Sequence, residues 1–191
     1  MRLLFFIFLQ IYITKGQETW ETLYTSFQSD DQNDANGWIL SNNYNEKIFT
    51  TCKSSLLFGG YNAFGTNTIV SKQFNMPPHY KINITFEFWK IDCWDTEFAY
   101  IITEDTFWSR SYTCTQGEQQ CGGAVGWDEY IQSITFEMNH YQESLIFIVT
   151  TNLDGTPNDE SWGMRGFSLS ILRCPQGCIY CQDNNINNCF Y

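Results

Sequence analysis

Basic residues are scarce in this chain, which has 10 lysines and arginines against 21 aspartates and glutamates among its 191 residues. The net charge is −11 at pH 7. A surface with this excess of negative charge repels nucleic-acid phosphates and anionic membranes. The sequence therefore predicts no nucleic-acid partner.

Histidine is scarcer still, with only His79 and His140. A Ser–His–Asp hydrolase needs a histidine beside a serine nucleophile, and no nucleophile motif such as Gly-x-Ser-x-Gly is present. His79 follows Pro77-Pro78 where a strand begins, and His140 stands where another ends. We interpret both histidines as structural.

Long hydrophobic runs are also missing, apart from the nearly apolar stretch Leu3–Ile13 behind the basic start Met1-Arg2. This run is shorter than the ~20 residues that span a bilayer, and small residues follow it at Thr14-Lys15-Gly16. Residues 1–16 resemble a signal peptide whose cleavage leaves Gln17 first, with a buried N-terminal strand as the alternative. We expect a secreted or extracellular surface protein with no membrane-spanning segment after signal removal.

Cysteine, in contrast, is plentiful, and four of the eight cysteines stand close to the C-terminal end of the sequence. Extracellular cysteines in even number are normally paired, so we predict that all eight form disulfides. They are Cys52, Cys93, Cys114, Cys121, Cys174, Cys178, Cys181 and Cys189. A zinc site is the alternative for the last four, but zinc ribbons are mostly intracellular and the signal peptide argues against that location.

The pairing of these cysteines is only partly predictable, since eight cysteines permit about a hundred connectivities. Cys114 and Cys121 close a short polar loop and are the first candidate pair. Cys52 and Cys93 could then join two strands, and the four C-terminal cysteines would pair among themselves.

Alternating apolar and polar residues run through the body of the chain. In residues 80–88 and 134–139 every second side chain is apolar, as in a strand with one buried and one solvated face. Residues 167–171 alternate in the same way. Leu145–Val149 is apolar on both faces and indicates a central strand that is covered on each side.

Turn signals separate these strands, among them Gly59-Gly60, Pro77-Pro78, Gly122-Gly123 and Asp154-Gly155. Many short strands with such turns indicate an all-β fold, an antiparallel β-sandwich of jelly-roll-like form. The predicted parts are a signal peptide at 1–16, a β-sandwich domain at 17–173 and the start of a disulfide-rich cysteine repeat at 174–191.

One N-glycosylation sequon is present, Asn83-Ile84-Thr85, on the polar face of the strand at 80–88. A secreted protein can carry a glycan at such a triplet, so we predict modification of Asn83. Chance occurrence of the triplet is the alternative.

The segment Ile91–Glu97 resembles the catalytic strand of laminarinase-type glycosidases, Glu-x-Asp-x-x-Glu. Aligning Asp92 with the central aspartate puts Lys90 at the nucleophile position and Asp95 at the acid/base position. A retaining glycosidase needs two carboxylates there, one of them the nucleophile, and lysine cannot take that role. The sequence therefore predicts no enzyme, and a hydrolase on a concanavalin-like sandwich is the disfavoured alternative.

Calcium is the candidate cofactor, because a hard cation prefers several close oxygen ligands. The acidic loop Asp30–Gly37 lacks the ligand spacing of an EF-hand and is interpreted as a polar turn. The candidate metal ligands are Glu97, Asp154, Asp159 and Glu160. A hydrogen-bonded loop at the entry to a strand is the alternative for these residues.

Tryptophans could form a sugar-binding platform by stacking. The candidates are Trp108, Trp127 and Trp162. Buried tryptophans in the core of a sandwich are the alternative.

Four further segments stand out, namely Phe58–Gly65, Asn75–Tyr80, Phe88–Glu97 and Asn158–Phe167. In these segments the chain resembles a family of secreted and surface proteins of ciliated protists. The resemblance covers residues 20–189 and implies a jelly-roll, MAM-like or galactose-binding-like sandwich followed by growth-factor-receptor-type (furin-like) cysteine-rich repeats. Two features depart from the family: Cys93 stands where a serine is expected, and the repeats break off after Cys189, as in a short or truncated member.

Together these observations predict a non-enzymatic extracellular binding or adhesion module. Its loops at one end of the sandwich would contact a glycan or protein ligand, with calcium as the candidate cofactor. The alternative is a structural component of a secreted coat or extracellular matrix, in which the sandwich associates with copies of itself.

Overall fold

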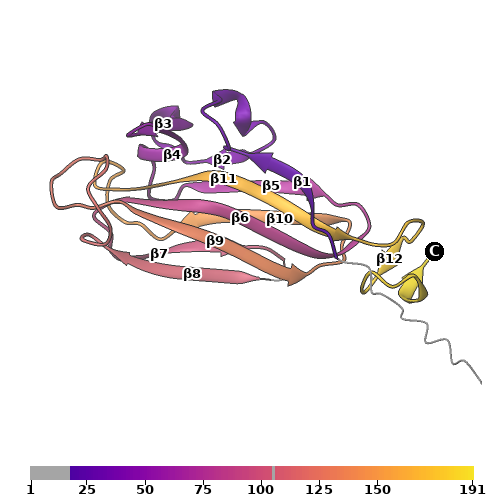
Figure 1. Ribbon diagram of the computed structural model, residues 1–191. Helices are drawn as coiled ribbons and strands as arrows, with labels where there is room; N and C mark the ends of the chain where they lie inside the picture. Colours follow the sequence, from indigo (N-terminus) through magenta and orange to yellow (C-terminus); the bar gives the residue numbers. More distant parts are fainter. Residues whose placement is uncertain (1–17, 105) are drawn as a thin grey trace, which may run out of the picture.

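The computed structural model describes residues 18–104 and 106–191, so the predicted signal peptide at 1–16 lies outside the described residues. Two antiparallel sheets pack face to face (Figure 1). The six-stranded sheet contains β1 (Glu21–Ser26), β3 (Phe49–Cys52), β4 (Ser55–Phe64), β6 (His79–Asp92), β9 (Tyr130–Asn139) and β11 (Glu160–Arg173). The five-stranded sheet contains β2 (Ile39–Ser41), β5 (Ile69–Asn75), β7 (Asp95–Ile102), β8 (Phe107–Thr113) and β10 (Ser144–Thr151). The predicted antiparallel β-sandwich of jelly-roll form is confirmed.

The six-stranded sheet is built around its two longest strands, β6 and β11, which pair along nearly their whole length. The other edge of β11 is shared, because β4 pairs with its first half and β1 with its second half. The change of partner occurs at Gly166, whose φ of +68° favours glycine and whose amide donates to the Phe27 carbonyl.

The core lies between the sheets and follows the period-two pattern of the strands. Every second side chain of β6, from Ile82 to Phe88, is buried there. Phe147 of β10 and Phe167 of β11 meet across the two layers with ring centroids 5.1 Å apart. Burial of a large apolar side chain stabilises the folded state by about 1.5–3 kcal/mol, so these aromatic contacts carry much of the stability.

The outer face of β10 differs from our expectation. β10 is the central strand of the five-stranded sheet, whose order is β2-β5-β10-β7-β8. Ile146 is nevertheless 41% exposed, and no described residue buries it, so the prediction of a strand covered on both faces is wrong. The sequence places apolar residues on a sheet face that is open to solvent.

Gly59-Gly60 does not form the predicted turn but lies within β4. The two glycines have φ values of +87° and +92°, and a Cβ on Gly59 would lie 2.1 Å from the Phe64 ring. Gly59 pairs with Gly163 of β11, and Phe64 pairs with the adjacent residue Trp162. The residues of β4 between Gly59 and Phe64 therefore form a bulge. Glycine is required here for a bulge rather than for a turn.

All eight cysteines form disulfides, as predicted, but two of the predicted pairs are wrong. Cys52 pairs with Cys121, and Cys93 pairs with Cys114, because Cys93 and Cys114 stand at adjacent ends of the antiparallel strands β7 and β8. The four C-terminal cysteines pair among themselves as expected. Their disulfides are Cys174–Cys181 and Cys178–Cys189.

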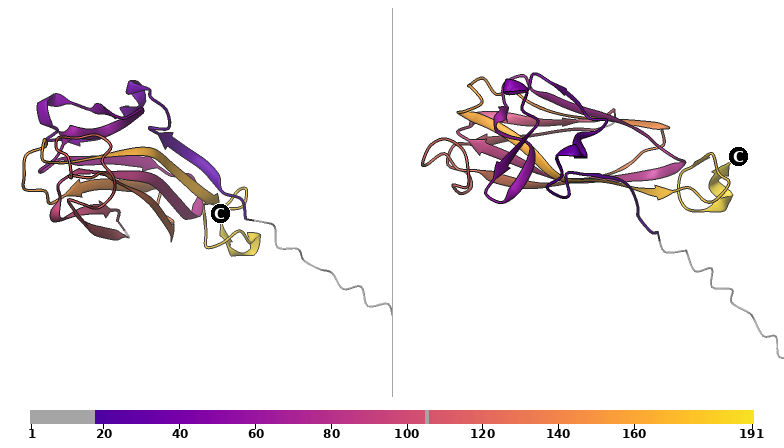
Figure 2. Two further views of the ribbon diagram at one scale, coloured as in Figure 1. Left: turned by 60° about the vertical axis from the view of Figure 1, so that its left-hand side comes forward. Right: turned by 90° about the horizontal axis from the view of Figure 1, so that it is seen from above.

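Residues 174–191, which we call the C-terminal module, lie beyond one end of the sandwich, next to the start of β6 (Figures 1 and 2). The module contains the short strands β12 (Tyr180–Cys181) and β13 (Cys189–Phe190). The loop at 114–129 lies at the opposite end of β6. Nowhere in residues 18–104 and 106–191 is there a helix with the length and apolarity that crossing a membrane requires.

Candidate functional site

Three aromatic side chains form a strip on the outer face of the five-stranded sheet. Phe98 and Tyr100 alternate along β7, and Phe107 projects from the neighbouring strand β8. The ring centroids of Phe98 and Tyr100 lie 6.2 Å apart, and those of Tyr100 and Phe107 lie 5.8 Å apart, with nearly parallel planes in both cases. Phe98 is 38% exposed and Phe107 is 63% exposed, so this aromatic strip is available for stacking.

A row of isoleucines continues this surface across the other strands. Ile102 stands opposite Phe107 on one side and Ile148 on the other. Beyond Ile148, Ser71 of β5 interrupts the apolar row before Ile39 in the edge strand β2. Ile39 is 64% exposed. A contiguous apolar surface on a sheet face marks an interaction site more often than chance exposure does.

A polar hollow of about 450 Å³ adjoins the aromatic strip. Thr150 links the two features, because it lines the hollow and stands directly opposite Tyr100 in the sheet register. The side chains that line the hollow are mainly amides and hydroxyls. They belong to Asn42, Thr66, Asn67, Ile69, Thr150 and Thr151. Neutral hydrogen-bonding groups and flat apolar rings therefore stand side by side on one face.

Three of the four predicted metal ligands converge where the two sheets meet at one end of the sandwich. Glu97 lies in β7, Asp154 lies in the loop before β11, and Glu160 begins β11. Each offers a carboxylate oxygen, and these oxygens all lie within 4.8 Å of one another. Asp159 is not part of this carboxylate trio. Its backbone carbonyl accepts a hydrogen bond from the Cys93 amide.

Glu160 is the buried member of the carboxylate trio. Its carboxylate accepts a hydrogen bond of 2.9 Å from the Gly155 amide. Burial raises the pKa of Glu160, the hydrogen bond from Gly155 opposes this rise, and the negative charges of Glu97 and Asp154 add to it. A bound proton or cation would relieve this mutual repulsion. Three carboxylates supply oxygen ligands of the type that Ca²⁺ prefers, and backbone carbonyls or water would have to complete a set of about six to eight.

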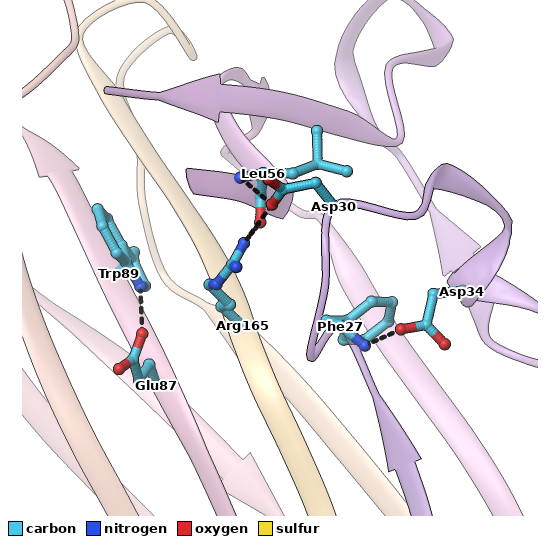
Figure 3. A network of polar contacts seen from close by, with 7 residues as sticks. All are labelled: Phe27, Asp30, Asp34, Leu56, Glu87, Trp89 and Arg165. Carbon is cyan, nitrogen blue, oxygen red and sulfur yellow. Dashed lines mark hydrogen bonds and ion pairs between the residues drawn. The ribbon is translucent and has the colours of Figure 1, made fainter. Parts of the chain in front are cut away.

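The acidic loop Asp30–Gly37 contains the short 3-10 helix η1 (Gln32–Ala35), whose first turn is capped by the Asp31 carboxylate, where the sequence predicted only a polar turn. Asp30 accepts from Arg165 at 2.9 Å and from the Leu56 amide at 3.2 Å, and Asp34 accepts from the Phe27 amide (Figure 3). The hydrogen bond from Arg165 lowers the pKa of Asp30. These carboxylates fasten the loop to the sandwich.

The glycosidase-like segment also has a structural role. Lys90 is fully buried and donates to the carbonyls of Cys114, at 3.1 Å, and Asp128, at 2.6 Å. Asp92 accepts from the Gly123 amide at 3.0 Å. These two buried side chains fix the loop at 114–129 to the end of β6.

The buried charges at this end of β6 shift one another's protonation. Burial lowers the pKa of Lys90 to about 8, opposed by the negative charges of Glu129, Asp128 and Asp92. Burial raises the pKa of Asp92 to about 7, opposed by its hydrogen bond from the Gly123 amide. The Glu129 carboxylate also holds the loop, because it accepts from the Cys121 amide at 2.7 Å.

The predicted tryptophan platform is not formed. Trp162 is fully buried in the core, and Trp108 lies edge-on against Phe136 between the sheets, with ring centroids 6.4 Å apart. Trp127 lies in the loop at 114–129. The exposed rings of the strip belong to phenylalanine and tyrosine instead, and the sequence pattern of β7 does not reveal them because residues 98–102 are apolar on both faces.

Asn83 lies on the outer face of the six-stranded sheet, opposite Ser170 and Glu137 in the register. Its side chain is half-buried, and the neighbouring side chains on this face are polar. Glycosylation of Asn83 stays a prediction.

No protein-family model and no curated protein sequence matches this chain. Among solved structures, it is similar to a family 35 carbohydrate binding module from Clostridium thermocellum, with 11% identity over 76% of this chain and 97% of that one and a TM-score of 0.40. It is also similar to the CBM22-1 xylan-binding domain of Xyn10C from Paenibacillus barcinonensis, with 10% identity, coverage of 82% and 97%, and a TM-score of 0.42. A third similar structure is latent PorU from Porphyromonas gingivalis, with 8% identity over 74% of this chain and 13% of that one and a TM-score of 0.44. At these identities and TM-scores the likenesses identify neither a family nor a ligand.

Proposed function

We propose that this protein is a non-enzymatic extracellular recognition module that binds glycan chains on the outer face of its five-stranded sheet. The observation that carries the proposal is the exposed aromatic strip of Phe98, Tyr100 and Phe107 beside a polar hollow. The disulfides fit the oxidising extracellular environment that such a module requires.

The chemistry of a sugar ring supports this choice of ligand. A pyranose has apolar C–H faces and a rim of hydroxyl groups, so it stacks on aromatic rings while its hydroxyls bond to amides and hydroxyls. The strip supplies the rings, and Asn42, Asn67 and Thr150 of the hollow supply neutral polar groups. Because the surface is open and shallow, we expect a dissociation constant between roughly 1 μM and 1 mM.

Two features support a binding function rather than catalysis. Glu104, in the turn between β7 and β8, is held by a hydrogen bond of 2.6 Å from the Ile146 amide to its carboxylate, and Glu160 of the carboxylate trio is buried, so these two carboxylates do not form an exposed catalytic pair. Lys90 and Asp92, which resemble part of a glycosidase strand, are buried against the loop at 114–129 and face no substrate.

We include Ca²⁺ binding by the carboxylate trio in this proposal. A cation at Glu97, Asp154 and Glu160 would hold the loop between β10 and β11 against β7. The same loop bonds to the aromatic strip, because the Phe98 amide donates to the Asn152 side chain at 2.6 Å. Calcium would therefore order the end of the strip rather than contact the sugar directly.

The proposal is tested by screening the purified protein on an array of neutral and charged glycans, followed by titration of any ligand. Phe107→Ala is expected to weaken binding about two- to tenfold, since a stacked aromatic contact is worth roughly 0.5–1.5 kcal/mol. Phe190→Ala is the matched control, because Phe190 is 60% exposed and lies in the C-terminal module. Absence of binding to every glycan, with and without calcium, would contradict the proposal.

Exposed isoleucines on the face of the five-stranded sheet favour a second candidate, the structural component of a coat or matrix. Ile39 and Ile146 are exposed apolar side chains that suit contact with a second copy of the chain better than contact with a sugar. Sedimentation distinguishes the two functions. Self-association that Ile39→Ser abolishes would favour the structural role, and a monomer at high concentration would count against it.

A further inference from the structure

The only two histidines of the chain lie in contact at the end of the sandwich that carries the C-terminal module. His79 begins β6 and His140 follows β9, and both side chains are buried. His79 Nε2 lies 2.7 Å from His140 Nδ1, and His79 Nδ1 lies 2.6 Å from the Pro77 carbonyl oxygen. The rings are nearly parallel, with centroids 4.9 Å apart.

The hydrogen bonds fix the protons of the neutral pair. The Pro77 carbonyl can only accept, so His79 Nδ1 carries a proton and, in a neutral ring, His79 Nε2 is an acceptor. His140 Nδ1 must then donate to it, which places one proton between the two rings. A first added proton can be accommodated, because the two rings can still share one proton at the contact. A second added proton puts an N–H group on both facing nitrogens, and the contact is lost.

The neighbours of both histidines hold the C-terminal module. The Pro78 carbonyl, next to His79, accepts a hydrogen bond of 3.1 Å from the Cys174 amide. Tyr141, next to His140, packs on Tyr180 of β12 with ring centroids 5.5 Å apart. Separation of the two histidines would therefore disturb both anchors of the module.

This interface is packed on one side and hollow on the other. Tyr80 and Leu172 of the sandwich form a small buried cluster with Cys181 of the module. A hollow of about 330 Å³ lies between the end of the sandwich and the module, lined in part by Pro77, Tyr141 and Ile179. The cluster that joins the module to the sandwich has far fewer buried members than the core between the sheets, so the module opens more easily than a core strand does.

We propose that the His79–His140 pair is a pH-sensitive contact that holds the C-terminal module against the sandwich at neutral pH and releases it in mild acid. This inference is independent of glycan binding, which lies on the five-stranded sheet. It concerns how a recognition domain is joined to the segment that follows it.

The charged groups around the pair favour its neutral form. Burial lowers the pKa of His79, the hydrogen bond to Pro77 opposes this, and the positive charges of His140 and Arg173 lower it further. Arg173 stands opposite His79 in the sheet register and is itself paired with Glu21.

The remaining ionisable groups at this junction lie on β6, on the loop after β9, on the N-terminal segment and in the module. Tyr80 is buried beside His79, and burial followed by the charge of Glu18 raises its pKa to about 12, so it stays neutral throughout. Asp183 also acts on Tyr80, and Tyr141 and Glu143 line the hollow. Ordinary carboxylates titrate near pH 4, below the range in which histidine does.

The sign follows from the lowered pKa of His79. The open state takes up protons near the ordinary histidine pKa of about 6.5, whereas the closed state resists them to lower pH. The contact is fully stable at pH values above the ordinary histidine pKa. Its stability is lost as the pH falls toward the lowered pKa that His79 has in the closed state. Opening takes up one or two protons, so the open population rises between about ten- and one-hundredfold per pH unit in this range.

The test is an NMR titration of the full chain from pH 8 to pH 4.5. Its two imidazoles give the only histidine signals, and we expect two separate steps, the second well below the ordinary pKa. The Cys174 amide should lose exchange protection in the second step, together with the contact between Tyr141 and Tyr180. The Ile179 amide is the internal control, because it bonds to Phe190 inside the module at 2.8 Å and should stay protected.

Two variants separate a titrating contact from a merely structural one. His140→Phe retains a ring but cannot be protonated, so opening should lose most of its pH dependence. Arg173→Met removes a repelling charge and should shift opening to lower pH. The proposal is overturned if both imidazoles titrate together near pH 6.5 while Cys174 stays protected, or if His140→Phe opens with the wild-type pH profile. If His140→Phe does not fold, the wild-type titration and Arg173→Met decide the question.

Discussion

Replacement of Lys90 by methionine tests whether buried charges hold the loop at 114–129. Methionine retains most of the side-chain volume but removes the ammonium group. The carbonyls of Cys114 and Asp128 lose their donor, and the buried carboxylates of Asp92 and Glu129 lose the positive charge between them.

The expected cost is large because the site has no access to water. Removal of one partner from a buried charged group costs about 3–5 kcal/mol, since the remaining charges stay buried without compensation. This is a large part of the 5–15 kcal/mol that stabilises an ordinary domain, taken as a rough range. The matched control is Lys81→Met on the same strand, where an exposed ion pair with Glu137 at 3.1 Å should contribute only about 0–1 kcal/mol.

The assay is equilibrium unfolding in guanidinium chloride, followed by tryptophan fluorescence, with hydrogen exchange of the loop at 114–129 as a local readout. We expect Lys90→Met to lower the free energy of unfolding by several times the effect of Lys81→Met and to deprotect the Asp92–Gly123 contact. Equal effects of the two substitutions would refute the assignment of Lys90 as the anchor of the loop.

Three further predictions follow from the same structure. Asp92→Asn should flatten the pH dependence of thermal stability between pH 4 and 7. Burial raises the pKa of Asp92 to about 7, so the wild-type protein loses stability as the pH rises through the pKa of the folded state. Equal pH profiles of wild type and variant would contradict this prediction. Replacement of both Cys52 and Cys121 by alanine should cost about 4 kcal/mol in guanidinium unfolding, because this disulfide closes a long loop, and a cost below 1 kcal/mol would contradict the expectation. Ca²⁺ should raise the melting temperature more than Mg²⁺ does, and Glu160→Gln should abolish the difference; no effect of Ca²⁺ on the wild type would remove calcium from the account.

The strands were predictable because their alternation is a local property. In β6 the residues from Ile82 to Phe88 alternate cleanly, and one buried face follows from that pattern alone. The pairing of Cys52 with Cys121 was not predictable, since these residues are 69 positions apart and meet only through the order of strands in the sheet. Proximity in the sequence favoured a disulfide between Cys114 and Cys121. In the structure, the register of β7 and β8 places Cys93 beside Cys114, and these two cysteines form the disulfide.

The candidate site illustrates the same limit. Residues 98–102 of β7 are apolar on both faces, so their pattern does not tell whether Tyr100 or Ile101 points outward. Only the packing of the two sheets decides that the aromatic strip faces solvent. Three members of the acidic set converge because β7 and β11 both begin at this end of the sandwich, whereas Asp159 is excluded although it adjoins Glu160 in the sequence.

The most direct test of the central claim is an NMR map of the glycan-binding surface. The isotope-labelled protein is titrated with a glycan that it retains on the array, and amide shifts are followed residue by residue. The account predicts shifts concentrated at Phe98, Tyr100, Phe107 and Thr150, with the Asn83 face of the six-stranded sheet unchanged. Shifts confined to the loop at 114–129 or to the C-terminal module, or no shifts with any glycan, would contradict it.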